Sequence, residues 1–497
     1  MEGEIMAEVK NFKRIAVCNR GEVAVRIIEA CHQLGMEAVL LHSEPDIGTR
    51  AYRMANDCVL LTGDSPYLDI KQNAEAAKNA MADAVHPGFG FLSENADFAE
   101  AVIGAGLTFI GPMPDSIRNM GDKISAKKLM EEARVPCIPG YKGEDQSLER
   151  LKSEASKIGF PVLIKAAAGG GGRGMKVSRS KADFAEQLDS AKRESLAAFG
   201  SDQVFLEKYL ENTKHIEFQI FGDQYGNYVH LFERECSVQR RHQKIIEEAP
   251  SPSLNDETRK LMAEAAVRAA EKVNYIGAGT VEFLLAGQDF YFLEMNTRLQ
   301  VEHPVTEYIT GKDLVQTQIK VAMGSPLPFL QSQIEKNGHS IECRLYAEDP
   351  YKKGIPSTGE IFHQKFPKGE GRRFDYAFDP GDSVTSFYDP MIGKLIVHAE
   401  NRELACKKMI QVLQETEIFG IQTNIDFLVE IINHPDFFTG VMTTGFIEEY
   451  FSNALGEKKW SEEEMQVVEQ LMIQLANQYN QPKEKTLAAW QNAWRNV

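Results

Sequence analysis

Four consecutive glycines, Gly169 to Gly172, lie in a stretch of this sequence that could bind phosphate. Glycine loses more backbone entropy on folding than any other residue, so such a run rarely serves stability. Bare amide groups can instead approach a ligand closely and surround phosphate oxygens. Strand-like sequence flanks the run, which predicts a hairpin with Lys165 at its base and Arg173 near its end. We interpret it as a phosphate-binding loop and not as a linker, because linkers lack flanking strands and cations.

A pair of glutamates could hold a metal ion. The residues on either side of Gly287-Gln288-Asp289 predict a β-hairpin, and a three-residue loop would place Glu282 directly across from Glu294. Facing carboxylates destabilise a sheet unless a cation lies between them. Asn296 follows two residues later, on the same face of the strand. Two carboxylates and an amide oxygen suit Mg²⁺ or Mn²⁺. In any other register the pair is two surface glutamates.

Three further segments carry polar side chains that could bind an anion or another ligand. Arg298, Gln300 and Glu302 follow the predicted metal pair, and together they could bind and deprotonate a small oxyanion. The segment 233–244 is dense in charge, which usually indicates a solvated surface, but apolar residues follow at once and an anion site needs cations. The segment 86–95 follows a predicted strand, where ligands bind in parallel sheets, although a plain turn would also explain it.

The composition excludes several classes of protein. A formal net charge of −17 argues against a nucleic-acid-binding protein, so an anion site must be a local cationic pocket. The 497 residues, 43% hydrophobic and 26% charged, suggest a soluble enzyme with about three domains. Seven scattered cysteines without a Cys-x-x-Cys pair indicate a reduced, cytoplasmic compartment. We expect no membrane span and no targeting segment, while Met1 and Met6 are both candidate start residues.

The order of apolar and turn residues divides the chain into four parts. Strand–helix alternation over residues 1–119 predicts a doubly wound parallel sheet. Residues 120–338 contain the candidate chemistry, with a small lid at about 136–206. Residues 339–453 have an α+β pattern. Residues 454–497 are predicted to form a helical tail.

The predicted tail contains all three tryptophans, Trp460, Trp490 and Trp494. Apolar residues from Met465 to Tyr479 recur at three- and four-residue spacing, which predicts an amphipathic helix. Packing against its own body and docking of a partner subunit are equally consistent with this pattern.

Taken together and in order, these segments resemble the biotin carboxylase family of ATP-grasp enzymes over about residues 13–450. The resemblance is carried by Asn19–Glu22, His86–Asn95, Gly121–Lys123, Lys165–Met175, Glu233–Lys244, Glu294–Pro304, Phe387–Leu395 and Gly420–Asn424. The family commonly has one more glycine before Gly169, and often Pro or Ala in place of Thr297. Neither departure removes a functional group. The implied fold is an N-terminal doubly wound domain, a central ATP-grasp domain with a lid and a C-terminal α+β domain.

The resemblance also implies a reaction and a role for individual residues. ATP, bicarbonate and biotin would give carboxybiotin, ADP and phosphate by way of carboxyphosphate, with Glu302 as the base and Arg344 stabilising the biotin enolate. The bicarbonate site would be Lys244, Arg298, Gln300, Val301 and Glu302. The metal ligands would be Glu282, Glu294 and Asn296. The ATP site would be Lys123, Lys165, Gly169, Gly170, Gly171, Gly172, Gly174, Met175, Glu207, Lys208, Leu210, His215, Gln239 and His242.

The biotin acceptor of this family is a Met-Lys-Met element, and the sole Met-Lys pair here is Met175-Lys176 in the predicted ATP loop. We therefore expect biotin on a separate carrier protein, a carboxyltransferase subunit of an acyl-CoA (acetyl- or propionyl-CoA) or pyruvate carboxylase, and a homodimer. Another ATP-grasp ligase would lack Arg344 in its context. A regulator without activity should have lost Lys244, Arg298 or Glu302.

Overall fold

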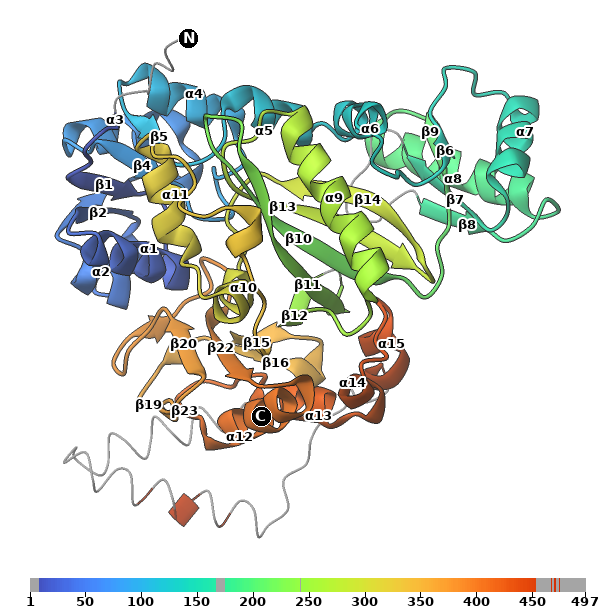
Figure 1. Ribbon diagram of the computed structural model, residues 1–497. Coiled ribbons are helices and arrows are strands. Elements are labelled where there is room, and N and C mark those ends of the chain that lie inside the picture. The colour runs from blue at the N-terminus through green and yellow to red at the C-terminus, as the bar shows by residue number, and fades with distance from the viewer. Residues whose placement is uncertain are drawn as a thin grey trace.

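The computed structural model describes residues 9–166, 175–241 and 243–452, together with 466, 469, 470 and 473. Figure 1 shows the N-terminal domain in blue, a central sheet in green and yellow with a smaller domain projecting from it, and a C-terminal layer in orange and red. The glycines of the predicted phosphate loop, His242 and all but four residues of the predicted tail lie outside the described part.

The N-terminal domain is built on a parallel sheet with the strand order β3-β2-β1-β4-β5. Its strands are β1 (Arg14–Val17), β2 (Glu37–His42), β3 (Asp57–Leu60), β4 (Ala84–His86) and β5 (Thr108–Phe109). Ile15 packs against α1 (Gly21–Gln33), whereas Ala16 packs on the opposite face with α3 (Ile70–Asn79) and α4 (Ala96–Gly104). Helices therefore cover both faces, as buried parallel strands require, and the predicted doubly wound pattern is confirmed.

Two loops meet where the neighbouring strands β1 and β4 end. The side-chain amide of Asn19, just after β1, donates hydrogen bonds to the carbonyl oxygens of Pro87 (2.7 Å) and Phe89 (2.8 Å). Gly88 has a φ of +65°, and a Cβ there would lie 2.8 Å from the Asn19 amide nitrogen. The close approach fixes the segment 86–95 at the edge of the sheet where ligands bind in this type of fold.

One long antiparallel sheet joins the central and C-terminal parts, in the order β14-β13-β10-β11-β12-β15-β22-β20. These strands are β10 (Lys214–Gly222), β11 (Tyr228–Arg240), β12 (Gln243–Ala249), β13 (Gly277–Ala286), β14 (Asp289–Asn296), β15 (His339–Tyr346), β20 (Arg372–Tyr376) and β22 (Met391–Ala399). The alanine-rich helix α9 (Asp256–Lys272) buries one side on this sheet (Figure 1). The predicted boundary at 338–339 lies just before β15, so hydrogen bonding in the sheet continues across it.

A small lid domain projects from the central sheet (Figure 1). Its sheet has the order β6-β9-β7-β8, and α6 (Lys123–Glu132) precedes it. The elements are β6 (Gly140–Tyr141), α7 (Leu148–Ile158), β7 (Val162–Ala166), β8 (Met175–Ser178), α8 (Phe184–Phe199) and β9 (Val204–Lys208). Leu151, Ile164 and Phe184 contribute to a separate apolar core. The strands on either side of the glycine loop pair as predicted, with Lys165 opposite Met175.

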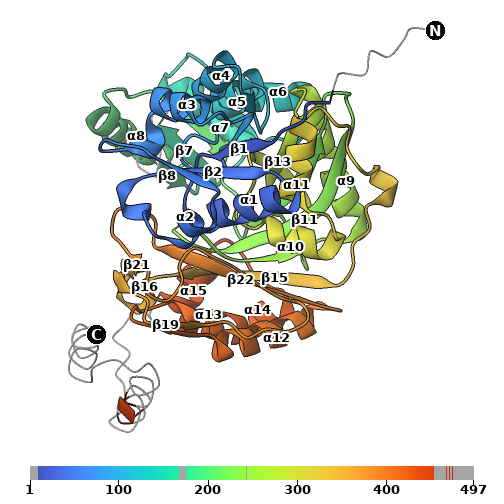
Figure 2. The ribbon, with the colours of Figure 1, turned by 90° about the vertical axis from the view of Figure 1, so that its left-hand side faces the viewer.

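The C-terminal layer lies beneath the other two parts (Figure 2). Helix α1 packs on β20 and β22, α10 (His303–Thr310) packs on β15 and β22, and α12 (Arg402–Glu415) covers the opposite side of β15 and β22 (Figure 2). The remaining elements are α2 (Arg50–Met54), α5 (Pro114–Gly121), α11 (Leu314–Ala322), α13 (Ile425–Asn433), α14 (Pro435–Thr439), α15 (Phe446–Phe451), β16 (Glu348–Asp349), β17 (Ile355–Pro356), β18 (Gly359–Glu360), β19 (His363–Lys365), β21 (Ser383–Val384) and β23 (Glu417–Phe419). Within the described ranges, no helix is both long and apolar enough to cross a bilayer.

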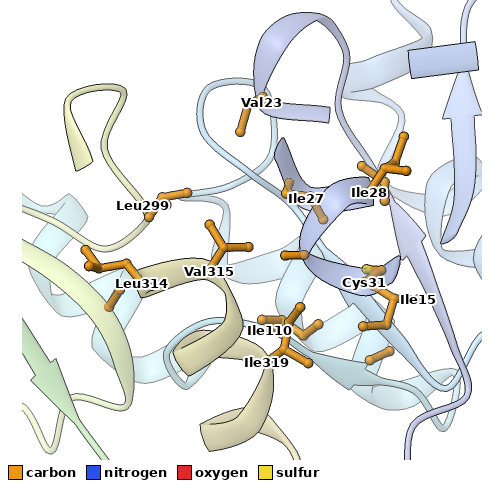
Figure 3. Packing of buried hydrophobic residues seen from close by; sticks show 14 of the residues in the cluster. Ile15, Val23, Ile27, Ile28, Cys31, Ile110, Leu299, Leu314, Val315 and Ile319 are labelled. Atoms are coloured by element: carbon orange, nitrogen blue, oxygen red, sulfur yellow. The ribbon is translucent and has the colours of Figure 1, made fainter. Parts of the chain in front are cut away.

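A shared apolar core locks the N-terminal domain to the central part (Figure 3). Val23 and Ile27 of α1 face Val315 of α11, and Leu299 joins them from the loop after β14. Leu299 is fully buried. This single side chain therefore anchors the segment that carries Arg298 and its neighbours.

Gly222, at the end of β10, should be intolerant of any side chain. A Cβ at Gly222 would lie 2.0 Å from the carbonyl oxygen of Tyr275, so the strand end would have to move. We expect Gly222→Ala to lower the free energy of unfolding by about 1–3 kcal/mol. Gly104→Ala is the matched control, because a Cβ at the end of α4 meets nothing within 4 Å and alanine is favoured in helices by about 0.5–1 kcal/mol. Equal urea midpoints for the two variants would contradict this account.

Candidate functional site

The predicted metal pair forms by a different route from the expected one. The turn between β13 and β14 has two residues, because Ala286 pairs with Asp289, and Leu293 is an extra residue between the paired positions. This bulge brings Glu282 opposite Glu294. The expected pairing is therefore confirmed, whereas the expected three-residue loop is wrong. A bulge shifts register by one residue, so it compensates for the shorter turn.

The two glutamates have different surroundings. Glu282 accepts hydrogen bonds from Asn296 (2.8 Å) and Gln300 (3.1 Å) and lies 2.9 Å from Nε2 of His215. Burial alone would raise the pKa of Glu282, but Lys244 and His215 hold it below its ordinary value. Glu294 faces a cavity, and partial desolvation and the Glu282 carboxylate raise its pKa. These carboxylates, with the Asn296 amide oxygen, form a hard-ligand set that suits Mg²⁺.

A cavity of about 610 Å³ separates the lid from the central sheet. The predicted site residues in its wall are Lys123, Lys165, Met175, Glu207, Glu294 and Asn296. Lys165 lies 2.5 Å from Glu207, and Lys127 and Lys142, which the sequence did not single out, line the same wall. The wall therefore brings lysines from three separate elements close to the metal pair.

Other predicted ATP-site residues are not part of this wall. The ammonium of Lys208 donates to the carbonyl oxygens of Gly159 (2.8 Å) and Phe160 (3.0 Å), so its side chain supports the lid. His215 lies beside Gln239, with 2.9 Å between Nδ1 and the amide nitrogen. Leu210 is half-buried just after β9. Gly169, Gly170, Gly171, Gly172, Gly174 and His242 lie outside the described residues.

Lys244 is the centre of a cluster of buried carboxylates beside the predicted metal pair. Its ammonium lies 2.5 Å from Glu217, 2.9 Å from Glu282 and 2.7 Å from Glu302. Burial lowers the pKa of a lysine, but these three carboxylates raise that of Lys244 well above its ordinary value. Carboxylates from β10, β13 and the loop before α10 therefore converge on one cation.

Glu302 is fully buried between two cations. One carboxylate oxygen accepts from Lys244 and the other accepts from Arg344 at 2.9 Å. Burial would raise the pKa of Glu302, yet Lys244, Arg344 and Arg234 hold it well below the ordinary value. Arg344 also donates to Glu247 at 2.6 Å. Glu302 is therefore an ionised carboxylate with an ordered set of donors.

Arg298 is held by the N-terminal domain. Its Nε donates to Glu94 (2.8 Å), and the other oxygen of Glu94 accepts from the backbone amide of Thr297 (3.0 Å). Arg298 also donates to Asn296 (2.8 Å) and Gln300 (3.2 Å). The segment 86–95 thus does more than turn the chain, because one of its carboxylates orients a predicted substrate-binding guanidinium.

Besides Lys127 and Lys142, four charged residues of the site were not singled out from the sequence: Glu94, Glu217, Arg234 and Glu247. Glu217 alternates with His215 on β10, and that polar face was the signal that could have identified it. Arg234 is completely buried and bonds Glu217 at 2.5 Å, Gln219 at 2.8 Å and Thr306 at 2.9 Å. Its place in a charge-dense segment gave no indication of burial.

Residues 122–330 match the family model for the ATP-binding domain of the carbamoyl-phosphate synthase L chain, so the central part is an ATP-binding domain of the ATP-grasp class. Residues 11–117 and 342–449 match the N-terminal and C-terminal domains of biotin carboxylase. The chain belongs to the biotin carboxylase family, and the predicted family and fold are both confirmed.

Two kinds of relative match the chain. It is 48% identical over 445 residues to methylcrotonoyl-CoA carboxylase subunit alpha of Dictyostelium discoideum, covering 88% of this chain and 64% of that protein. It is 45% identical to biotin carboxylase 1 of Bacillus subtilis strain 168, covering 88% of this chain and 99% of that protein. The chain thus spans less than two thirds of the methylcrotonoyl-CoA carboxylase alpha subunits that it matches.

Solved structures agree with the fold. The biotin carboxylase domain dimer of Hydrogenobacter thermophilus 2-oxoglutarate carboxylase, in complex with MgADP, ADP and bicarbonate, has a TM-score of 0.82 and 44% identity, covering 90% of this chain and 99% of that one. A biotin carboxylase from Campylobacter jejuni has a TM-score of 0.82 and 43% identity, covering 88% and 99%.

Replacing Glu294 by glutamine should weaken metal binding. The substitution removes one charge from the ligand set, so we expect Mn²⁺ affinity, measured by electron paramagnetic resonance, to fall at least about tenfold. A raised pKa means that Glu294 takes up a proton as the pH falls. Wild-type affinity should therefore decrease with falling pH more steeply than that of the variant. Glu264→Gln on the exposed side of α9 is the control, and unchanged Mn²⁺ binding by Glu294→Gln would refute the assignment.

Proposed function

We propose that this chain carboxylates biotin carried on a separate protein, using ATP and bicarbonate. The observation that carries the proposal is the buried Glu302, which is ionised between Lys244 and Arg344. The same Lys244 also pairs with Glu282 of the predicted metal pair. In the balanced reaction, bicarbonate attacks the terminal phosphorus of ATP to give carboxyphosphate and ADP. Carboxyphosphate then breaks down to CO₂ and phosphate, the phosphate takes the ureido proton of biotin, and the resulting nitrogen nucleophile attacks CO₂ to give carboxybiotin.

The nucleotide is proposed to lie in the cavity beneath the lid. Lys123 and Lys165 in its wall would neutralise the phosphate chain, and the backbone amides of the glycine loop would add donors. A divalent ion held by Glu282, Glu294 and Asn296 would offset the negative charge of the transferring phosphoryl group. Closure of the lid would exclude water, which is required because carboxyphosphate hydrolyses readily.

Bicarbonate is proposed to bind beside Glu302. Lys244, Arg298 and the amide of Gln300 present donors there, and the Val301 backbone completes the loop. The bound anion would compete with Glu302 for Lys244 and so free one carboxylate oxygen. Because Glu302 is already ionised, it can take the proton from bicarbonate as the oxygen attacks phosphorus.

Arg344 is proposed to act at the second step. Its guanidinium is fixed by Glu247 and Glu302, which leaves its orientation settled before biotin arrives. A positive charge in a buried site stabilises the negative oxygen that develops when the ureido group loses a proton. The phosphate released from carboxyphosphate would take that proton.

The proposed partners are a biotin carrier protein and a carboxyltransferase subunit. Bacterial relatives named biotin carboxylase match over nearly their whole length, and the Hydrogenobacter domain crystallised as a dimer, which supports a homodimer here. The relatives belong to carboxylases that act on different acceptors, so we propose that the carboxyltransferase subunit determines which acceptor is carboxylated. All seven cysteines are free thiols, which supports a reducing, cytoplasmic compartment.

Wild-type protein should hydrolyse ATP in a bicarbonate-dependent manner that free biotin stimulates. Glu302→Gln should lower kcat for this reaction by about 10²–10⁴-fold, because the base is lost while the side chain keeps its size. ADP affinity should change little, since Glu302 lies outside the nucleotide cavity. If phosphate release by the wild type depended on neither bicarbonate nor biotin, the proposed function would be refuted. A fully active Glu302→Gln variant would refute the assignment of Glu302 as the base.

Arg344 should affect the two half-steps unequally. We expect Arg344→Met to lower biotin carboxylation by about 10²–10³-fold while bicarbonate-dependent ATP cleavage in the absence of biotin stays within about tenfold. The test uses the double variant with Glu247→Gln, because Arg344→Met alone would leave the buried Glu247 carboxylate without its partner. Glu247→Gln alone is the control. Equal losses in both assays would show that Arg344 serves bicarbonate binding or folding instead.

A further inference from the structure

Lys394 is a completely buried cation beneath the bicarbonate loop, and the reaction as described does not use it. It lies on β22 directly opposite Arg344 of β15, so the two side chains emerge on the same face of the sheet. Its ammonium donates a hydrogen bond to the carbonyl oxygen of Val301. That carbonyl belongs to the peptide bond that joins Val301 to Glu302.

The counter-charge of Lys394 comes from a different domain. Glu22, in the first turn of α1, has a carboxylate oxygen 3.3 Å from the Lys394 ammonium, and Asp375 on the neighbouring strand lies 3.9 Å away. In the described part of the chain, Lys394 is the one cation within ion-pair distance of Glu22. Lys394 thus connects the C-terminal layer, the N-terminal domain and the bicarbonate loop.

We propose that Lys394 is a positioning residue for bicarbonate activation, which fixes the Val301–Glu302 peptide so that Glu302 faces Lys244 and Arg344. The peptide unit is planar, so a bond to the Val301 oxygen also sets the direction in which the Glu302 Cα leaves the loop. Glu22 has a different role, because it pairs with the Lys394 ammonium and makes no bond to the loop that carries Val301 and Glu302. This inference rests on the proposed function, since it assigns a role within the same site.

Three variants separate positioning from structural support. Lys394→Met removes the bond to Val301 but leaves Glu22 buried without a partner, which is destabilising. Glu22→Gln removes the nearer of the two carboxylates around the ammonium, leaves Asp375 in place and keeps the bond. The double variant removes both charges, and replacement of a whole buried pair by neutral groups is often tolerated. Lys407→Met, on the exposed side of α12, controls for the loss of a lysine.

The bicarbonate KM is the first readout. We expect the double variant to unfold close to the wild-type temperature and yet to raise the KM for bicarbonate about tenfold or more, with the KM for ATP within about twofold. Glu22→Gln should raise the bicarbonate KM by no more than about threefold. A folded double variant with a wild-type bicarbonate KM would overturn the proposal. Equal rises for Glu22→Gln and the double variant would also overturn it.

Hydrogen exchange tests the loop without any need for turnover. Peptides that cover residues 299–305 should exchange faster in the double variant than in the wild type, whereas lid peptides from 175–208 should not change. Unchanged exchange at 299–305 would overturn the role of Lys394 even if the wild type proved to catalyse another reaction. Absence of bicarbonate-dependent ATP cleavage in the wild type would instead reject the proposed function, so the two failures are distinguishable.

Discussion

The site depends on the ammonium of Lys244, which forms ion pairs with three carboxylates in a buried space. Two of them, Glu217 and Glu302, are completely buried, and each lies on a different element. Uncompensated charges in such a place cost several kcal/mol, about 3–5 kcal/mol when one partner of a buried pair is removed. His215, Glu217 and Glu282 approach one another as metal ligands do. Lys244 lies beside Glu217 and Glu282 and, together with Arg234, supplies positive charge there.

The pairing with Lys244 gives the two carboxylates of the predicted metal pair, Glu282 and Glu294, different roles. Glu282 is bonded to Lys244 and His215 and therefore belongs to the fixed framework. Glu294 extends into the cavity, where desolvation and the neighbouring Glu282 carboxylate raise its pKa. A cation that arrives with a nucleotide would thus relieve the charge on Glu294 and meet a preorganised Glu282. In the proposed function, the nucleotide half and the bicarbonate half of the site would share Glu282, which would place phosphoryl transfer next to Glu302.

The sequence predicted those parts of the fold that depend on local pattern. Apolar runs such as β1 and β2 gave the parallel N-terminal sheet, and alternation gave the β13–β14 hairpin. It did not predict that β12 would pair with β15, because that contact joins segments far apart in the chain. It also missed the bulge at Leu293, since a shorter turn with a bulge gives the same Glu282–Glu294 pairing as the expected loop. Arg234 was missed because charge density alone does not distinguish a solvated face from a buried network.

The loop from Thr297 to Glu302 is anchored by contacts that do not involve the lid. Leu299 is inserted into the core between α1 and α11, Glu94 holds Arg298, and Lys394 holds the Val301 carbonyl. All three anchors lie where the N-terminal domain, the central sheet and the C-terminal layer pack together. The lid has its own small core and is joined to the central sheet at Phe292, whose backbone amide donates to the Pro136 carbonyl. In the proposed function, closure of the lid over a nucleotide would therefore leave these anchors of Glu302 and its cations in place.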